Sequence, residues 1–393
     1  MSSTATWRRD VIYLDHNATT PVDGEVRETI ASALAAFGNP SSSHKFGITA
    51  RACIENARRQ VAELIGCAAS EIVFTSGGTE SNNLAILGIA ARSGKGHVIT
   101  SAIEHPSILR PVRWLQERGF EVTVLPVDSS GLVYPDDVRN EIRENTILIT
   151  VMHANNETGA LQPIREIGLI AREHNVPFHT DAAQSVGKMA VSVSGLSVDL
   201  LTVVSHKFYG PKGVGALYIR GFGEGPAAHV PAPITFGAGH EHGLRPGTEN
   251  TPCIAGLGKA CEIALRDAEE RSSHAAALRD TLHRLLEDRL DVELNGHTIE
   301  RLPNTLNISI GGIIAEDLVD ALRDSVALSS GSACHAGVRA PSPVLKAMGT
   351  PDERALSSVR LTVGKDNTVQ EMHTAAELIV RAVLHVRSKT HPG

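Results

Sequence analysis

Long apolar runs and excess positive charge are both missing from this sequence. No stretch reaches the roughly 18 consecutive apolar residues that a membrane-spanning helix needs. The N-terminal segment MSSTATWRRDVIYLDHN has no apolar run behind its two arginines, so we do not expect a secretory signal. A net charge of −7 and a pI near 6.2 give no reason to expect nucleic acid or a membrane as the main partner.

Cysteines are few and scattered. The chain has five of them, and no two are spaced C-x-x-C. An odd number without regular spacing, in a chain of 393 residues, argues against a disulfide framework and for a reducing compartment. We therefore expect a cytoplasmic protein in which at least one thiol is free to react.

From about residue 70, short β-rich runs alternate with helical stretches. The β-rich runs occupy 71–74, 97–100, 121–127, 146–152, 177–180, 200–205 and 214–219. Several of them are apolar throughout, as expected for strands covered on both faces. Between them, apolar residues at helical spacing mark 108–119 and 164–175. This alternation predicts an α/β domain with a mainly parallel sheet.

The second half of the sequence is organised differently. Residues 222–252 are rich in Gly, Pro and His without periodicity and predict a long loop, which inside a compact domain is often functional. A strongly helical stretch, 254–290, follows. A second, α+β domain is indicated by strands at 305–310, 326–329 and 359–363 that alternate with helices at 315–324, 341–349 and 369–388.

Two charged residues stand at the ends of predicted strands. Lys207 closes the run DLLTVVSHK, where a buried ammonium is expensive and an imine with an aldehyde cofactor would neutralise it. Asp181 follows strand 177–180 at the edge where an open parallel sheet collects ligands, and could pair with a protonated pyridine nitrogen. Taken alone, Lys207 is more simply a loop-end lysine facing solvent, and Asp181 a helix N-cap.

Two further segments are expected at the same sheet edge. In FTSGGTESNNLAI (74–86) a strand leads into a Gly-Gly turn and a helix that begins near Thr79, whose free N–H groups suit a phosphate. His105 follows the next predicted strand and could stack on a flat ring and shuttle protons, and Asn155 and Asn156 follow a later one. Such turns and loop histidines are common, so these signals gain weight only beside the lysine and the aspartate.

One cysteine lies in a setting unlike the other four. Cys334 sits among small residues in LSSGSACHAGVRAPSPVL (328–345), after a strand and before a Pro-initiated helix. This composition indicates a loop with an accessible thiol, whose thiolate would be the attacking form. The alternative is a small surface residue without chemistry. The remaining cysteines lie in apolar, helix-like settings and are expected to be inert.

Taken in order, these motifs resemble the pyridoxal-phosphate-dependent cysteine desulfurases and their close relatives the selenocysteine lyases, which share the class V aminotransferase fold. The resemblance covers nearly the whole chain, through YLDHNATTPV, GNPSSSH, TSGGTESNN, IEH, ANNETG, TDAAQSVGK, SHKFYGPKG, LRPGTENTP, SSGSAC and SSVRLTVG. It implies an α/β fold type I enzyme. A large cofactor-binding domain would span 15–260, and a small α+β domain carrying the cysteine loop would comprise 1–14 and 261–393.

The resemblance also implies roles around pyridoxal 5′-phosphate. Lys207 would hold the cofactor as an imine, Asp181 would pair with its pyridine nitrogen, and His105 would stack on the ring and take part in proton transfer. Gln184 and Asn156 would reach the region of the ring hydroxyl. The phosphate would be held by Gly78, Thr79, Ser205 and His206, together with Thr248 of the neighbouring subunit. A homodimer with a shared active site is therefore implied.

The substrate implied by the resemblance is L-cysteine. Arg360, helped by Asn17 and Asn39, would clamp its carboxylate through a bidentate pair. The freed Lys207 would remove the α-proton, and Cys334 would attack the sulfur. The products would be alanine and a persulfide on the cysteine, for delivery to an acceptor protein in a pathway such as iron–sulfur cluster assembly.

One departure from the family pattern concerns the phosphate. Many desulfurases carry a serine where this chain has Val204, two positions before His206. One expected phosphate hydroxyl is therefore lost, unless Ser205 replaces it.

Three other functions stay open from the sequence. HKFYGPKG, GTENTP and PSPVL resemble selenocysteine lyases, which makes L-selenocysteine the alternative substrate, whereas SSGSAC and the seven residues to Pro341 resemble longer-loop desulfurases. A class V aminotransferase would need the lysine and the aspartate but no loop cysteine. A metal- or partner-binding protein on a retired enzyme fold is conceivable because GHEHG places His240 and His242 two apart. No carboxylate or thiolate cluster accompanies these histidines, so we expect no metal.

Overall fold

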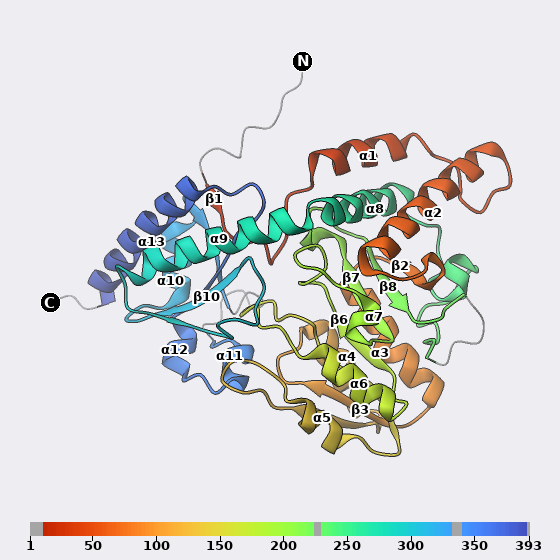
Figure 1. The fold of residues 1–393 in the computed structure, drawn as a ribbon, viewed down its shortest axis with the longest axis horizontal. Coiled ribbons are helices and arrows are strands. Elements are labelled where there is room, and N and C mark those ends of the chain that lie inside the picture. The colour runs from red at the N-terminus through yellow and green to blue at the C-terminus, as the bar shows by residue number, and fades with distance from the viewer. Residues whose placement is uncertain (1–10, 224–228, 332–339, 391–393) are drawn as a thin grey trace.

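The structure is a computed structural model that describes residues 11–223, 229–331 and 340–390. Two sheets dominate it (Figure 1), a mostly parallel seven-stranded sheet in the larger part and a four-stranded antiparallel sheet in the smaller part. Cys334, the expected nucleophile, lies outside the described residues.

The seven-stranded sheet confirms the α/β prediction. Its strand order is β2-β8-β7-β6-β5-β3-β4. The strands are β2 (Ile72–Thr75), β3 (His97–Ser101), β4 (Glu121–Leu125), β5 (Thr146–Thr150), β6 (Phe178–Asp181), β7 (Leu200–Val204) and β8 (Gly215–Ile219). β8 pairs antiparallel with both β7 and β2, and the other pairs are parallel. Because two reversals cancel, β2 ends at the same edge as β7.

Helices cover both faces of this sheet, which explains why its inner strands are apolar throughout. One face packs against α2 (Lys45–Ile65), α6 (Ile164–Glu173) and α8 (Thr251–Arg266). The other packs against α3 (Gly78–Ser93) and α4 (Pro106–Gln116). The other helices of this part are α1 (Gly24–Leu34), α5 (Pro135–Glu141) and α7 (Val193–Leu196).

The smaller part has a core of its own. Its sheet has the order β12-β13-β10-β9 and consists of β9 (Val292–Leu294), β10 (Thr305–Ile310), β12 (Ser329–Ser330) and β13 (Ser358–Thr362). Its helices are α9 (Ala268–Glu287), α10 (Ala315–Leu322), α11 (Pro343–Ala347), α12 (Asp352–Leu356) and α13 (Val369–Thr390). Figure 1 shows α9 extending from the end of α8 across to this part.

The expected strand 326–329 is divided between two sheets. β11 (Val326–Ala327) pairs in parallel with β1 (Ile12–Tyr13), whereas β12 pairs with β13. Leu14 belongs to the core of the smaller part, and Cys261 of α8 to the core of the large sheet. The domain limits at 14/15 and 260/261 stay predictions.

The long loop expected at 222–252 is confirmed within its described residues up to Asn250, apart from the short 3-10 turn η3 (His240–Gly243), and Thr251 already begins α8. Glu241 and His242 in this turn adopt positive φ of 46° and 56°, a strained backbone for residues with side chains. The buried Glu241 carboxylate accepts hydrogen bonds from both terminal nitrogens of Arg58, at 2.8 and 2.9 Å, and from the Phe74 amide at 2.8 Å. These bonds tie the loop to α2 and to the edge strand β2.

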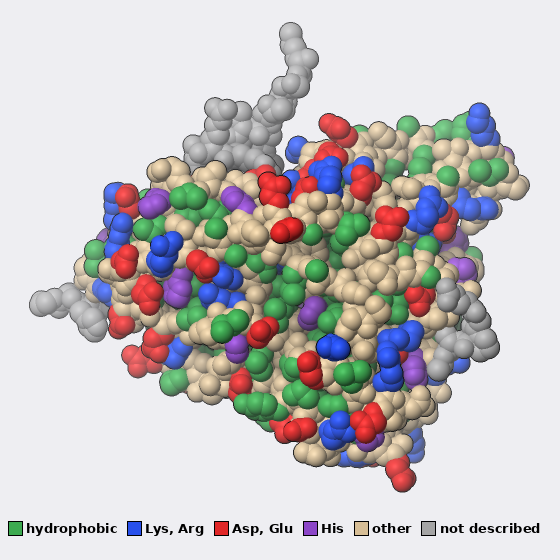
Figure 2. Space-filling model, in the orientation of Figure 1, with side chains coloured by type: hydrophobic (Ala, Val, Ile, Leu, Met, Phe, Trp, Pro, Cys, Tyr) green, Lys and Arg blue, Asp and Glu red, His purple; other side chains and the backbone are tan. Residues whose placement is uncertain are grey.

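The surface carries charges of both signs. Figure 2 shows acidic and basic side chains interspersed over one face of the molecule. Within the described ranges, no helix combines the length and apolar character needed to span a bilayer.

Candidate active site

The residues with expected cofactor roles gather at the carboxyl edge of the large sheet. His105 follows β3, Asn156 follows β5, Asp181 ends β6 and Lys207 follows β7. The Gly78 turn follows β2, which ends at this edge because it runs in the direction of β7. Ligands of open α/β sheets bind outside this edge, so the topology brings together segments that are far apart in sequence.

The Lys207 amine lies in a desolvated position. Its Nζ donates hydrogen bonds to the backbone carbonyls of Asn17 and Ala18, at 2.7 and 2.9 Å. Burial, together with nearby Arg360, lowers the pKa of Lys207 to about 8, although Asp181 acts in the opposite direction. About half of this amine is therefore unprotonated and nucleophilic at pH 8, and roughly a tenth at pH 7.

A chain of hydrogen bonds joins Asp181 to His105. Asn82 Nδ2 donates to Asp181 Oδ2 at 2.7 Å and to Ser107 Oγ at 2.8 Å, and that hydroxyl lies 2.8 Å from His105 Nδ1. The Ala183 amide donates to the other carboxylate oxygen at 2.9 Å. Sequence reasoning missed Asn82 and Ser107. Asn82 could have been found because it is a polar residue four positions after Gly78, on the helix face that must pack against the sheet.

His105 is held as a neutral ring. The Ser107 amide donates to its Nδ1 at 3.1 Å, which leaves the proton of the neutral imidazole on Nε2. Although part of the residue is exposed, neighbouring protein desolvates the ring and lowers the pKa of His105, against the opposing effect of Asp181. At neutral pH the ring can therefore accept a proton.

The turn after β2 suits an anion. The first N–H groups of α3, at Gly78 and Thr79, have no partner within the helix and point out of its N-terminus. His206 follows β7, the second strand from β2 in the sheet, and its Nδ1 lies 3.1 Å from Thr19 Oγ1. Burial, with Lys207 nearby, lowers the pKa of His206 to about 4, so this ring is neutral at pH 7.

Ser205 does not fit its expected phosphate role. A Cβ placed on Gly210 would lie 2.1 Å from the buried Ser205 Oγ, which therefore faces the side of the strand where α8 packs. A Cβ placed on Gly78 would instead lie 2.6 Å from a methyl of Val204. Neighbouring residues of a strand face opposite sides, so the valine faces the phosphate turn and the serine faces away.

Arg360 reaches the same site from the smaller sheet. From β13 it forms an ion pair with Asp15, Nη2 to Oδ1 at 2.7 Å, and donates from Nη1 to the Asn156 carbonyl at 3.1 Å. The Nε of this buried arginine has no hydrogen-bond partner among the described residues. An unpaired buried donor is costly, and an incoming carboxylate would satisfy it.

The Asn17 side chain is already fully used inside the protein. Its Nδ2 donates to the Asn156 carbonyl at 3.2 Å and to Thr305 Oγ1 at 2.9 Å, and the residue is buried. The backbone carbonyl of Asn17 accepts hydrogen bonds from Gln184 Nε2 at 3.1 Å and from the Lys207 amine. Asn17 therefore ties the two sheets together beside Arg360, rather than offering a free amide to a ligand.

Asn39 and Thr248 lie apart from this cluster. Within the described part of the chain, neither is hydrogen-bonded to a residue of the sheet edge. Asn39 Oδ1 accepts from the Ser41 amide at 2.9 Å, and Ser41 Oγ lies 3.4 Å from His240 Nε2, in the loop that carries Thr248. Figure 1 shows α1 and α2, which flank Asn39, extending along one side of the large part.

The histidines proposed as a possible metal site have separate partners. The Gly247 amide donates to His240 Nδ1 at 3.3 Å, whereas His242 packs edge-on against Phe222 at 5.5 Å. The described residues hold no group of three or more His, Cys, Asp or Glu placed to bind a metal. Burial raises the pKa of the Cys67 thiol to about 12 and that of Cys261 further, which makes both thiols poor nucleophiles.

Sequence comparison places the chain among known enzymes. The family model described as Aminotransferase class-V matches residues 12–374. Cysteine desulfurase IscS of Dictyoglomus turgidum is 46% identical over 382 residues, covering 96% of this chain and 95% of that protein. Cysteine desulfurase IscS of Methanosarcina thermophila is 45% identical over 384 residues, covering 96% and 93%.

Solved structures agree with these relatives. A NifS-like protein superposes with a TM-score of 0.88 at 35% identity, covering 95% of this chain and all of its own. SspA in complex with cysteine gives a TM-score of 0.80 at 38% identity, covering 91% of this chain and 100% of that one. The chain therefore belongs to the pyridoxal-phosphate-dependent cysteine desulfurases of the class-V aminotransferase family.

Proposed function

We propose that this protein removes sulfur from L-cysteine, producing L-alanine and a persulfide on Cys334 that an acceptor protein then takes. The observation that carries the proposal is one sheet edge holding an amine of lowered pKa, Lys207, beside Asp181 and His105. The names of the IscS relatives and the cysteine complex of SspA support this substrate.

The residues at the sheet edge fit pyridoxal 5′-phosphate. When bound, this cofactor supplies an electron sink for the charge left on the substrate α-carbon. The Lys207 amine would hold the aldehyde carbon, and the Asp181 carboxylate, oriented by Asn82, would pair with the ring nitrogen. Gln184 and Asn156 would lie at the ring oxygen. The phosphate would be bound by Gly78, Thr79 and His206.

The remaining residues bind the substrate and move its protons and sulfur. Arg360 would take the carboxylate through its unpaired Nε, with Asp15 fixing the guanidinium. Lys207 would accept the α-proton, and the neutral His105 would take up the proton of the substrate thiol. The Cys334 thiolate would attack the substrate sulfur, so that an S–S bond forms and the Cβ–S bond breaks. The carbon keeps the electron pair of that bond and is protonated to complete alanine.

The proposal is tested by replacing the nucleophile. We expect Cys334→Ala to lower alanine release from L-cysteine by about a hundredfold or more, because the sulfur then has no acceptor within the site. Alanine release from L-selenocysteine should change far less, since a selenol ionises readily and depends less on a nucleophile. The measurement is steady-state alanine formation from both amino acids, by wild type and variant.

Cys67→Ala is the matched control, because that thiol has a raised pKa and lies away from the sheet edge. It should leave both activities unchanged. Full desulfuration of L-cysteine by Cys334→Ala would contradict the proposed persulfide. A wild type active on L-selenocysteine alone would instead identify a selenocysteine lyase.

We further propose that two copies of the chain share their active sites, each lending Thr248 to the phosphate, and Asn39 to the substrate, of the other. Large apolar side chains are exposed where α1 joins α2 and in the loop before Thr248, namely Leu34, Phe37, Phe46, Ile48 and Phe236. Phe37 is 76% exposed and Phe236 is 87% exposed. One exposed apolar side chain is ordinary, but a group of them marks an interaction surface. A second copy of the chain would cover them.

A charge at this surface should separate the copies. We expect wild type at twice the 41.8 kDa chain mass and Phe37→Glu to weaken self-association by about a hundredfold, as for a central aromatic anchor. Sedimentation equilibrium measures the effect. Trp114 on α4 is also exposed, but its ring is covered by Arg118. Trp114→Glu should therefore leave the mass unchanged. A monomeric wild type that still binds the cofactor tightly would contradict the shared site.

A further inference from the structure

Lys188 lies beside the active site without a role in the chemistry described so far. It follows β6 in the segment TDAAQSVGK, and its Nζ donates hydrogen bonds to Asn17 Oδ1 and to Gln184 Oε1, both at 2.7 Å. No carboxylate of the described residues forms an ion pair with it. Lys188 is half-buried, and a lysine withdrawn from water usually pairs with an acid, so two amide oxygens are an unusual set of partners.

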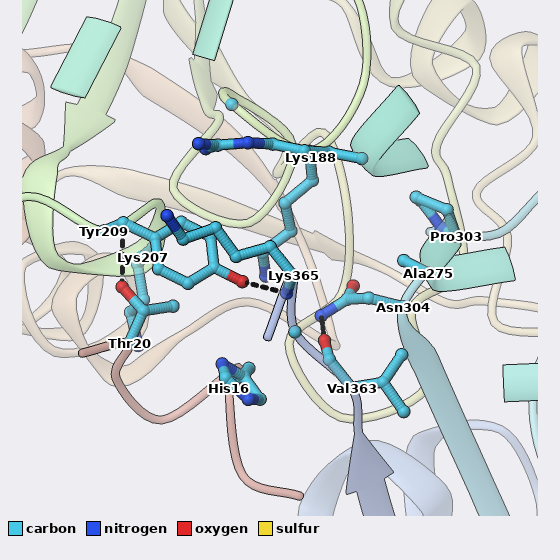
Figure 3. Close-up of a pocket in the computed structure, with 13 residues that line it drawn as sticks. His16, Thr20, Lys188, Lys207, Tyr209, Ala275, Pro303, Asn304, Val363 and Lys365 are labelled. Atoms are coloured by element: carbon cyan, nitrogen blue, oxygen red, sulfur yellow. Dashed lines mark hydrogen bonds between the residues drawn. The ribbon is translucent and has the colours of Figure 1, made fainter. Parts of the chain in front are cut away.

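This lysine lines a small cavity together with the Lys207 amine. Lys188, Lys207, Tyr209 and Asn304 come from separate segments and surround one cavity (Figure 3). The cavity measures about 30 Å³, enough for a water molecule but far too small for a cofactor. Lys188 therefore acts on the site through Asn17 and Gln184, which accept its hydrogen bonds.

The contacts of Lys188 determine which way the Gln184 amide faces. In both contacts its amine donates, so the partner atom must be the amide oxygen. With Oε1 turned to Lys188, the NH₂ group of Gln184 is turned the other way, and one of its N–H bonds reaches the Asn17 carbonyl at 3.1 Å. The second N–H remains to be donated. Without Lys188, the amide could rotate and present an acceptor in its place.

The Asn17 amide is oriented in the same way. Its Oδ1 accepts from Lys188 and, at 3.0 Å, from Asn304 Nδ2, so its NH₂ group must face the Asn156 carbonyl. That carbonyl also accepts from Arg360. The Lys188 amine thus fixes which way two side-chain amides face, that of Gln184 on the cofactor side of the site and that of Asn17 on the substrate side.

We propose that Lys188 is a positioning residue that fixes the orientation of the Gln184 amide, so that Gln184 presents an N–H donor to the ring oxygen of pyridoxal phosphate. The inference rests on the proposed function, in which Gln184 lies at that oxygen. A donor there stabilises the oxygen as an anion. It would thereby lower the affinity of that oxygen for a proton.

The proton at this position can be followed by the visible absorbance of the loaded protein, independently of turnover. We expect Lys188→Met to raise the pH midpoint of the absorbance change by about one unit, the effect of losing one hydrogen bond to a charged oxygen. Gln184→Met should raise it similarly. The double variant should shift it no further than either single variant, because the two residues act through one contact.

The matched control is Lys365→Met. This lysine lines the same cavity but pairs with Asp23 and contacts neither amide. It should lower the melting temperature without moving the midpoint. If Lys188→Met also lowers only the melting temperature, Lys188 is structural and the inference is wrong. Additive shifts in the double variant would likewise overturn it.

Two further observations keep the test decisive. Should Lys188→Met not fold, Lys188→Gln retains a polar group but no longer dictates the amide orientation, and a smaller rise of the midpoint is expected. An unchanged midpoint in Lys188→Gln would count against the inference. Failure of the wild type to form a borohydride-sensitive absorbance with pyridoxal phosphate would instead refute the proposed function itself.

Discussion

Replacing Lys207 by alanine should lower kcat/KM for L-cysteine by about ten-thousand-fold or more, since one side chain both holds the cofactor and moves the α-proton. The amine lies at the sheet edge with a pKa near 8, so it is available for both tasks near neutral pH. The measurements are alanine release and the borohydride-sensitive absorbance, and both should be lost.

A related expectation concerns pH. The pKa of Lys207 is lowered, and only the neutral amine attacks an aldehyde. The rate at which cofactor-free protein takes up pyridoxal phosphate should therefore rise with pH and level off above about 8. Lys212→Ala, five residues further and exposed, should leave uptake and turnover unchanged. Retained uptake of cofactor as an imine by Lys207→Ala would refute the assignment.

Arg360→Gln should have the second largest effect, lowering kcat/KM by about a thousandfold, mainly through KM. The substrate carboxylate would lose its cation, and Asp15 would be left as a partly buried carboxylate without its ion pair. Arg360→Lys should recover little, because an ammonium cannot contact Asp15, the Asn156 carbonyl and a carboxylate in one plane. Steady-state kinetics with L-cysteine provide the test.

A buried arginine elsewhere in the smaller part serves as the control. Arg279 donates to the Leu302 carbonyl at 3.0 Å and is also buried, but it does not reach the sheet edge. Arg279→Gln should lower the melting temperature and leave KM unchanged. An unaltered KM in Arg360→Gln would show that the carboxylate binds elsewhere.

Most of the fold could be predicted from local patterns. Every strand of the large sheet begins within one residue of the start that the sequence predicts for it. The prediction works because buried parallel strands are apolar throughout. Helix α2 was missed, although Ile54, Val61 and Ile65 recur at helical spacing and Gly66 ends it in a left-handed conformation. The reversed direction of β8 was not predictable, since strand direction depends on connections and not on the composition of the strand.

The site was predictable where a motif ends a strand and not where distant segments meet. Lys207 and Asp181 could be found because parallel strands end at one edge. The Asn82–Asp181 contact spans 99 residues, and no local pattern announces it. The role expected of Ser205 shows a different limit, because only the alternation of side chains along β7 reveals that Val204 faces the turn.

The Glu241 contact also bears on how the folded chain avoids aggregating. β2 and β4 are the two outer strands of the seven-stranded sheet, and outer strands offer unpaired amides to any other chain. On β2, the Phe74 amide is taken by the Glu241 carboxylate. On β4, Glu121 pairs with Arg143 at the exposed rim. A strand of another chain would therefore find the Phe74 amide of β2 already hydrogen-bonded, and a solvated ion pair beside β4. Both features oppose the strand addition by which fibrils grow.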